Sequence, residues 1–228
     1  MKDISIVIPV FNEADNIQIL YNEILESLQN KINYEIIFVN DCSTDETDSV
    51  LNKLSKNNNI KIISHYKNLG QSHSILSGIN KSTYDTIVTL DGDNQNIPED
   101  ILNLLKIFSS EDLFLVGGIR VKREDSLLKI FSSKIANRIR SLILNDDCSD
   151  TGCGLKIFYK NIFLELPFFD GIHRFLPALF KGFGYKTKFI PVGHRPRLKG
   201  VSKYGIFDRL FRGIFDTIKV WKIIKKNK

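Results

Sequence analysis

Short apolar runs rich in β-branched residues recur through the first 120 residues, and segments of helical periodicity separate them. Runs of this length and composition are typical of strands buried on both faces of a sheet. They cover residues 4–11, 34–40, 60–65 and 84–90. Helices are expected over residues 12–28, over about 43–54 and 70–79, and from about residue 98. The alternation predicts an α/β fold, with a doubly wound, mostly parallel sheet flanked by helices.

Three of the expected strands end in acidic residues. Their ends are PVFNE at 9–13, NDCS at 40–43 and DGD at 91–93. In open α/β sheets, ligands bind beyond the carboxyl ends of the strands. One acid at such a position is commonly a helix cap or a first-turn acid. Three acidic ends at one edge of a sheet indicate a binding site instead.

The strongest candidate within that site is the pair Asp91 and Asp93. Two carboxylates on either side of a glycine can converge on one hard cation, and Gly92 is expected to leave space for a ligand. With the carbonyl of Gln95, the pair predicts a site for Mg²⁺ or Mn²⁺ that is shared with water and substrate phosphates. Such a cation neutralises charge on a diphosphate leaving group.

An Asp-x-Asp pair after an apolar strand also occurs in haloacid dehalogenase-type phosphatases, where the first Asp is a nucleophile. In those enzymes the pair follows the first strand, and Thr or Val stands two residues after the second Asp. Here the pair follows the fourth expected strand, and Gln95 stands at that position. The phosphatase hypothesis is therefore the weaker one.

The net charge of +6 suits three classes of partner: nucleic acid, an anionic membrane surface, or phosphorylated small molecules. No nucleic-acid-binding motif accompanies the charge, so nucleic acid is not expected. Three cysteines favour a reducing, cytoplasmic setting over a disulfide framework. The spacing of Cys148, Cys153, His173 and His194 matches no familiar zinc pattern. No signal peptide and no membrane-spanning run of about 18 apolar residues are expected.

Two stretches in the second half combine an apolar stripe with basic residues. The stripe of 127–144 includes Ile139 and Leu142, and the stripe of 206–226 includes Ile214, Ile218 and Trp221. Such helices pack on their own domain, form a dimer interface, or lie in a membrane interface with basic residues on anionic headgroups. All three alternatives stay open, although aromatic residues interleaved with Arg and Lys favour the membrane.

The order and spacing of six segments resemble the family-2 glycosyltransferases of the GT-A fold, and most of all the dolichol-phosphate or polyprenol-phosphate mannosyltransferase group. The segments cover nearly the whole chain. They are IVIPVFNE (6–13), VNDCSTDET (39–47), LDGDNQNIPE (90–99), GGIRVKRED (117–125), DTGCGLKIF (150–158) and RPRLKGVSKYG (195–205). The resemblance implies a Rossmann-like, mixed but mostly parallel sheet, followed by C-terminal amphipathic helices.

The resemblance also implies roles for individual residues at the donor. Two departures stand in the second motif, where Asn40 and Cys42 replace the usual Asp and Gly. Asp41 is kept, and it would recognise the base or the ribose. The residues that would bind the nucleotide sugar are Pro9, Phe11, Glu13, Val39, Asp41, Asp91, Gly92, Asp93, Arg120, Arg197 and Lys203. Those that would carry the reaction are Asp91, Asp93, Arg120, Arg197 and Lys203.

On the acceptor side, the resemblance implies contacts from Asp150, Thr151, Gly152, His173, Arg174 and Ser202. His173 and Arg174 open an apolar helical run, so packing or capping is an equal alternative for them. Arg197 and Lys203 lie in a basic loop, which without the acidic sheet edge would be a solvated surface. Both substrates would carry phosphate, and arginine suits that partner.

The implied activity is inverting, metal-dependent transfer of a sugar from GDP-mannose or a UDP-hexose to a dolichyl or undecaprenyl phosphate. The expected domains are a catalytic domain over 1–205 and an amphipathic, basic membrane-interface helix over 206–228. The chain would act peripherally on the cytoplasmic face of an anionic membrane, and a homo-oligomer stays open. The alternatives are a nucleotide-sugar-binding membrane-associated protein without turnover and a glycosyltransferase with a non-lipid acceptor.

Overall fold

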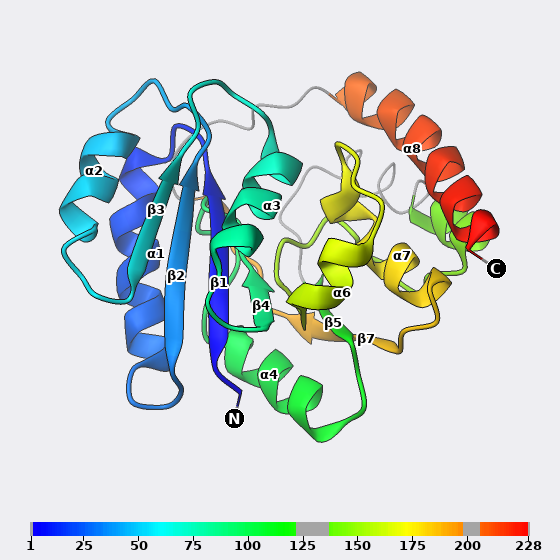
Figure 1. Ribbon diagram of the computed structural model, residues 1–228, viewed down its shortest axis with the longest axis horizontal. Helices are drawn as coiled ribbons and strands as arrows, with labels where there is room; N and C mark the ends of the chain where they lie inside the picture. The colour runs from blue at the N-terminus through cyan, green and yellow to red at the C-terminus, as the bar shows by residue number, and fades with distance from the viewer. Residues whose placement is uncertain (1, 122–136, 198–205, 228) are drawn as a thin grey trace.

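A seven-stranded mixed sheet forms the centre of the molecule, with the strand order β3-β2-β1-β4-β6-β5-β7 (Figure 1). The computed structural model describes residues 2–121, 137–197 and 206–227. The strands are β1 (Ile4–Val10), β2 (Tyr34–Asn40), β3 (Ile60–Ser64), β4 (Thr86–Thr89), β5 (Leu115–Arg120), β6 (Lys156–Tyr159) and β7 (Thr187–Val192). Among the strands of the described residues, β6 alone runs antiparallel to its neighbours, β4 and β5. The predicted mixed, mostly parallel sheet is confirmed.

Helices cover both faces of this sheet (Figure 1). They are α1 (Ala14–Leu28), α2 (Thr47–Leu54), α3 (Gln71–Lys81), α4 (Asp100–Ser110), α6 (Lys160–Glu165), the 3₁₀ turn η1 (Ile172–Arg174), α7 (Leu176–Gly182) and α8 (Ile206–Lys226). Residues 137–144 are also helical. The helices that follow the first four strands confirm the predicted alternation.

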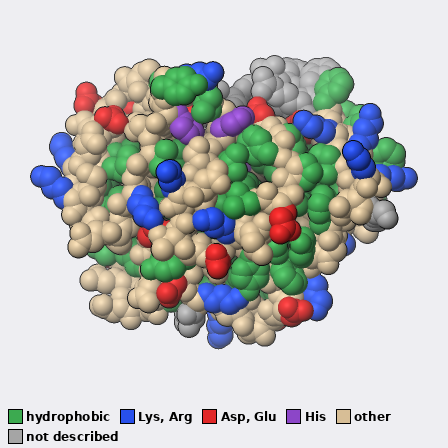
Figure 2. All heavy atoms as spheres, in the orientation of Figure 1, with side chains coloured by type: hydrophobic (Ala, Val, Ile, Leu, Met, Phe, Trp, Pro, Cys, Tyr) green, Lys and Arg blue, Asp and Glu red, His purple; other side chains and the backbone are tan. Residues whose placement is uncertain are grey.

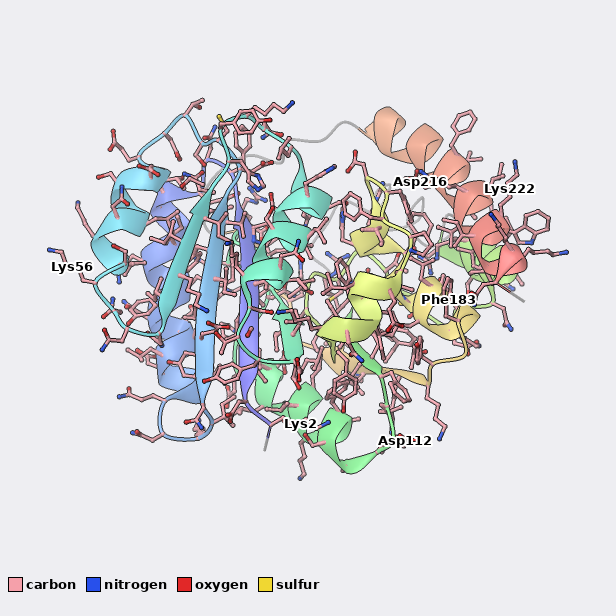
Figure 3. All side chains as sticks on the ribbon, in the orientation of Figure 1. Lys2, Lys56, Asp112, Phe183, Asp216 and Lys222 are labelled. Carbon is pink, nitrogen blue, oxygen red and sulfur yellow. The ribbon has the colours of Figure 1, made fainter. Side chains whose placement is uncertain are left out.

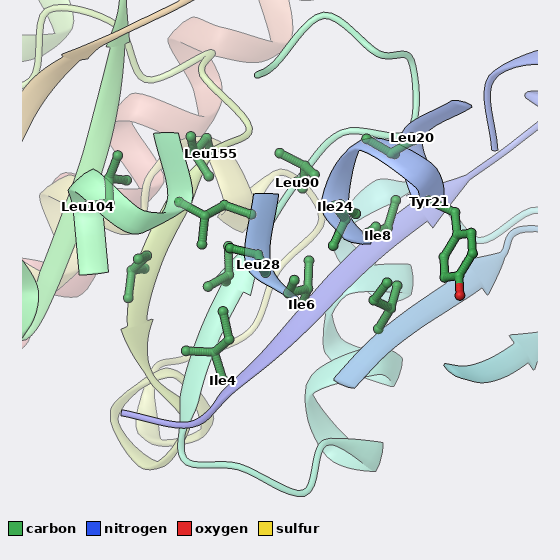
Figure 4. Close-up of a cluster of buried hydrophobic side chains, with 14 of the residues drawn as sticks. Ile4, Ile6, Ile8, Leu20, Tyr21, Ile24, Leu28, Leu90, Leu104 and Leu155 are labelled. Carbon is green, nitrogen blue, oxygen red and sulfur yellow. The ribbon is translucent and has the colours of Figure 1, made fainter. Parts of the chain in front are cut away.

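Two hydrophobic cores lie on opposite faces of the sheet, because successive side chains of a strand point to opposite sides. Ile4, Ile6 and Ile8 of β1 pack on one face against α1, α2 and α4 (Figure 4). Val7 of the same strand points to the other face, where α3, α6, α7 and α8 pack. A strand buried on both sides needs a continuous apolar run, which is the pattern that predicted β1.

The connections leave β1 in opposite directions, since β2 and β3 lie on one side of it and β4 on the other. The crevice outside such a switch point is where open α/β sheets bind ligands. Segment 9–13 includes the end of β1 at this point, and segment 91–93 follows β4. The topology therefore brings the two acidic motifs to one place.

The structure differs from the predicted start of α2. This helix begins at Thr47, whereas the periodicity predicted a start near residue 43. The preceding residues are held by the loop after β1 instead: Asn12 N–H donates to the Ser43 hydroxyl at 2.9 Å, and Thr44 N–H donates to Asn12 Oδ1 at 2.7 Å. Long-range side-chain bonds of this kind compete with helical hydrogen bonding.

The predicted C-terminal amphipathic helix is confirmed as α8, but it does not bury the predicted stripe. Thr217, Val220 and Ile224 face the domain and are buried. Ile224 packs so closely on α7 that a Cβ on Gly182 would lie 2.5 Å from Ile224 Cγ1. The residues of the predicted stripe whose side chains are described, Ile214, Ile218 and Trp221, are exposed to solvent.

Candidate active site

Asp91 is held by α3 on one side and by the loop before β6 on the other. Its Oδ1 accepts a hydrogen bond from Gln71 Nε2 at 2.9 Å. The backbone of Gly154 lies against its carboxylate, so that a Cβ there would be 2.2 Å from Asp91 Oδ2. Thr89 Oγ1 fixes this loop by donating to Gly154 O at 2.7 Å. The carboxylate therefore has one defined position.

Burial raises the pKa of Asp91 to about 6, and the negative charge of Asp93 adds to the shift. The positive charges of Lys156 and Arg120 act in the opposite direction. Two carboxylates at the end of a buried strand repel each other unless a cation lies between them or nearby. The electrostatics of the pair thus favour a bound cation, as the sequence predicted.

A side-chain cation already contacts the second carboxylate. Arg197 Nη2 lies 2.8 Å from Asp93 Oδ2, and Arg197 Nη1 lies 3.3 Å from Glu13 Oε1. The other oxygen of Asp93 accepts from the Gln95 N–H at 3.2 Å. The structure therefore unites three residues that the sequence placed at the donor site, from segments that follow β1, β4 and β7.

These residues fit a hard divalent cation. Carboxylate oxygens are its preferred ligands, and Mg²⁺ commonly takes only one or two of them, together with water and substrate phosphates. The guanidinium on Asp93 occupies a place that a cation can take. Within the described residues, no group of three or more His, Cys, Asp or Glu converges as a complete metal cage. The arrangement is a two-carboxylate site that needs further oxygen ligands.

Gly92 has a packing role that the sequence did not predict. The sequence suggested that it leaves space for a ligand, but a Cβ on Gly92 would lie 2.7 Å from Val10 Cγ1 and 3.1 Å from Pro9 O. The glycine is needed because the backbone after β4 packs directly on the end of β1. Gly154, by contrast, leaves the space that the Asp91 carboxylate itself fills.

Gln95 lies beside Arg195. Its backbone carbonyl accepts from Arg195 N–H at 3.1 Å, and its Nε2 donates to Arg195 O at 3.4 Å. These bonds join the loop after β4 to the segment after β7. Gln95 contacts Asp93 only through its own N–H, so its predicted place among the metal ligands gains no support from this geometry.

Arg120 and the predicted acceptor loop form one cluster. Arg120 Nε and Nη2 make a bidentate pair with Asp150, at 2.7 and 2.8 Å. A Cβ on Gly152 would lie 3.0 Å from Arg120 Nη2. Thr151 is held from another direction, since Arg140 donates to its hydroxyl. Arg120 is thus fixed close enough to Asp91 to affect that carboxyl's pKa.

In the segment VNDCSTDET (39–47), the side chains of Val39 and Asp41 are buried. Asp41 accepts from the N–H groups of Leu69 and Gly70 at 2.8 and 2.7 Å, and its Oδ1 lies 2.8 Å from His65 Nδ1. It therefore shapes the loop before α3. The side chain of Val39 is fully buried in the core, which leaves only its main chain for any ligand. Nucleotide contacts by these two residues remain predictions.

His173 and Arg174 link α3 to α8. His173 Nδ1 lies 2.8 Å from Ser72 Oγ, and Arg174 Nη2 donates to Asp216 Oδ2 at 3.1 Å. Figure 3 shows Asp216 on the inner side of α8 and Lys222 pointing outward. Burial lowers the pKa of His173 to about 3, and the charges of Arg174 and Lys156 act in the same direction. These contacts join elements of the fold, and acceptor contacts by the two residues remain predictions.

Sequence reasoning missed three residues that shape the site. Gln71 donates to Asp91, Gly154 gives it space, and the buried Lys156 donates to the carbonyls of Thr151 and Cys153. Lys156 and Gly154 stand inside the quoted segment DTGCGLKIF, and a lysine within an apolar strand was an available indication. Two predicted residues, Ser202 and Lys203, lie outside the described residues.

Comparison with known proteins supports the arrangement. The model of the family described as "Glycosyl transferase family 2" matches residues 5–166. An undecaprenyl-phosphate 4-deoxy-4-formamido-L-arabinose transferase of Photorhabdus laumondii is 33% identical over 221 residues, which are 96% of this chain and 67% of that protein. A dodecaprenyl-phosphate galacturonate synthase of Rhizobium johnstonii is 33% identical over 224 residues, with 96% and 66% covered. The chain spans about two thirds of the length of these relatives.

Solved structures show the same fold at low sequence identity. Glucosyl-3-phosphoglycerate synthase from Mycobacterium tuberculosis has a TM-score of 0.70 at 15% identity, over 98% of this chain and 80% of that one. Mannosyl-3-phosphoglycerate synthase from Rubrobacter xylanophilus has a TM-score of 0.71 at 14% identity, over 96% and 73%. The fold is GT-A, as predicted. Together with the family match, this shows that the chain belongs to glycosyltransferase family 2 and is a glycosyltransferase.

Proposed function

We propose that the chain transfers a sugar from a nucleoside diphosphate to a polyprenyl phosphate, with inversion, and uses Mg²⁺ or Mn²⁺ held by Asp91 and Asp93. The observation that carries the proposal is the union of these two carboxylates with Arg197 and the nearby Arg120 at one sheet edge. In a metal-bound diphosphate, the cation suits the two carboxylates and the phosphate oxygens suit the two arginines. The curated relatives are named as transferases or synthases of undecaprenyl or dodecaprenyl phosphate sugars.

In this proposal the nucleotide occupies the crevice between the ends of β1 and β4, beside Pro9, Phe11 and Glu13. When bound, the cation neutralises charge on the leaving diphosphate. Arg197 binds phosphate oxygens through its planar pair of donors. The base is met near Asp41, and GDP-mannose and UDP-hexoses are both candidates for the donor.

The acceptor approaches from the side of Arg120 and the loop 150–154. A phosphate monoester is already ionised at neutral pH, so its oxygen attacks the anomeric carbon without a general base. Direct displacement from the face opposite the diphosphate inverts the configuration. Arg120 is held rigid by Asp150 and contributes positive charge close to Asp91.

Exposed helical faces support a membrane-bound acceptor. Ile214, Phe215, Ile218 and Trp221 of α8 are between 40% and 72% exposed. The neighbouring lysines 219, 222, 225 and 226 are exposed as well. Figure 2 shows hydrophobic and basic side chains side by side over α8. This combination suits a helix that lies in the headgroup region of an anionic bilayer.

In the helical residues 137–144, apolar side chains are likewise exposed while a charged side chain is buried. Ile139 and Leu142, of the predicted apolar stripe, are exposed, whereas Arg140 is buried on Asp146 at 2.9 Å. No helix of the described residues is long and apolar enough to cross a membrane. We propose a catalytic domain over 1–205, a membrane-interface helix over 206–228, and peripheral binding at the cytoplasmic face.

The test is turnover by the purified protein with Mn²⁺, a panel of GDP and UDP sugars, and a short polyprenyl phosphate. We expect sugar transfer to the lipid phosphate and at least a ~100-fold loss in Asp93→Asn, because the metal site then lacks a charged ligand. Glu23→Gln, which removes an acid paired with Arg195 outside the site, is the control.

Three outcomes contradict the proposal, and for the first of them 3-phosphoglycerate is supplied as a second acceptor. Transfer to 3-phosphoglycerate and not to the lipid establishes a non-lipid acceptor. Donor binding without turnover on either acceptor favours a nucleotide-sugar-binding protein. Full activity of Asp93→Asn shows that the metal assignment is wrong.

A further inference from the structure

Arg197 lies where its charge serves two carboxylates of the site at once. Its Nη2 contacts Asp93 at 2.8 Å and its Nη1 contacts Glu13 at 3.3 Å. The side chains of Arg197, Asp93 and Glu13 are only 23%, 14% and 10% exposed, so these contacts are partly shielded from water. Shielded ion pairs of this kind are stronger than those on an open surface.

A metal ion that binds Asp93 would be repelled by the guanidinium group of Arg197. Asp93 Oδ1 faces the Gln95 N–H, and Oδ2 faces Arg197. A cation coordinated to Oδ2 at the usual distance of about 2.1 Å would meet a second positive charge on the same oxygen. Two cations on one carboxylate oxygen repel each other. Metal binding therefore requires Arg197 to move or weakens its ion pair.

A nucleoside diphosphate removes this conflict. It offers the guanidinium phosphate oxygens in the bidentate geometry that arginine prefers. It also brings oxygen ligands that complete the coordination of a metal on Asp91 and Asp93. Arg197 then exchanges one anionic partner for another, and Asp93 exchanges a guanidinium for a metal. Neither charge is left alone.

We propose that Arg197 is a resident counter-cation that keeps metal off Asp93 until the donor diphosphate draws it away. The inference rests on the proposed function and deepens it, because it makes metal and nucleotide bind as one unit. Binding couplings are reciprocal, so the metal strengthens nucleotide binding by the factor by which the nucleotide strengthens metal binding. Arg197 is thus a specificity residue for the metal complex of the diphosphate.

Arg195 provides a matched control. It carries the same charge two residues earlier in the chain, but it lies beside Glu23 and the carbonyl of Asn94. Arg195→Gln removes one positive charge near the site without removing the ion pair on Asp93.

The experiment measures Mn²⁺ affinity by electron paramagnetic resonance of the free ion, without sugar or lipid, and then with UDP or GDP. In the absence of nucleotide we expect Arg197→Gln to bind Mn²⁺ at least about fivefold more tightly than the wild type, at the lower end of typical couplings. Arg195→Gln should match the wild type. The gain in Mn²⁺ affinity on adding nucleotide should shrink in Arg197→Gln alone.

The proposal is overturned if Arg197→Gln binds nucleotide-free Mn²⁺ no more tightly than the wild type. It is also overturned if Arg195→Gln gains as much, because the effect is then one of net charge. Neither result touches the proposed function, which turnover with a lipid phosphate tests separately. Absence of Mn²⁺ binding from every variant, with and without nucleotide, overturns both this inference and the metal dependence.

Discussion

At the scale of single residues, the site depends on what stands beside each functional side chain. Asp91 keeps one orientation because Gln71 donates to it and because Gly154 has no side chain. Cys42 shows the opposite case, where a side chain is tolerated. It stands where the related motif has Gly and adopts a φ of +63°. A left-handed conformation costs a non-glycine residue roughly 1–2 kcal/mol.

Gly154→Ala should displace Asp91. The added methyl would lie 2.2 Å from the carboxylate, which is closer than any real contact. We expect turnover to fall about 100-fold, since a misplacement of about 1 Å has this effect, and stability to fall by about 1–3 kcal/mol. Steady-state kinetics and urea denaturation measure the two effects.

Gly213→Ala is the control for this change. A Cβ on Gly213 of α8 meets no atom within 4 Å. This variant should keep its turnover and gain up to about 1 kcal/mol, because alanine is the better helix former. Wild-type kinetics in Gly154→Ala would show that Asp91 is not held as the structure indicates.

At the scale of elements, α8 is anchored by one face and open on another. Its buried residues dock on α7, while the aromatic and basic residues point away from the domain. The periodicity identified a helix with an apolar stripe, but it assigned that stripe to one face and did not show which residues the domain covers. Two apolar faces on one helix are expected when one packs on protein and the other meets a second apolar medium.

Replacing Phe215 and Trp221 by serine should weaken binding to anionic liposomes. Each substitution removes exposed aromatic area from the face that would enter the bilayer interface. We expect at least about a tenfold loss of liposome affinity in sedimentation at low salt, with the free energy of unfolding unchanged. Phe168→Ser, also at an exposed aromatic residue but outside α8, serves as the control.

If the wild type does not sediment with anionic liposomes even at low salt, the membrane role of α8 is wrong. Concentration-dependent self-association that the double variant abolishes would assign the face to a second copy of the chain. That was one of the alternatives open from the sequence.

At the scale of the whole molecule, a chain of contacts joins Asp91 to α8. Gln71 and Ser72 are the first two residues of α3. Gln71 donates a hydrogen bond to Asp91, and Ser72 is hydrogen-bonded to His173. The next residue, Arg174, pairs with Asp216 of α8. Ser72 Oγ also accepts from the Gly171 N–H at 2.7 Å. The sheet edge and the C-terminal helix are therefore parts of one packed body.

His173 should make this body sensitive to acid. Its pKa of about 3 in the folded state lies below its usual 6.5, so the unfolded chain binds more protons between these values. The stabilisation is complete above pH 6.5 and is lost as the pH falls toward 3. For one proton, the free energy of unfolding falls by at most about 1.4 kcal/mol per pH unit.

Urea denaturation at pH 7.5 and pH 5 measures this contribution. The stability difference between the wild type and His173→Asn should shrink at the lower pH. Ser72→Ala keeps the imidazole and should keep the steep pH dependence, although it loses the hydrogen bond. If the free energy of unfolding depends on pH in the same way in the wild type and in His173→Asn, the lowered pKa of His173 is contradicted.

The sequence alone determined the order of strands and helices through the end of α4 at residue 110, and the acidic strand ends. These features were predictable because burial on both faces of a strand, and on one face of a helix, imposes a local pattern of apolar residues. The start of α2 was less predictable, since Asn12 contacts its N-terminal segment from another part of the chain. Motif order was specific enough to identify the family.

Only the tertiary structure decided which side chains meet. Arg197 and Asp93 are 104 residues apart, and Thr89 and the Gly154 carbonyl are 65 residues apart. Local periodicity contains no information about such pairs. The roles of Gly92, Gln95 and the outer face of α8 changed for the same reason, because each depends on a neighbour from a distant segment. The sequence specified the chemistry available at the sheet edge, and the packing of the loops before β6 and after β7 determined how it is arranged.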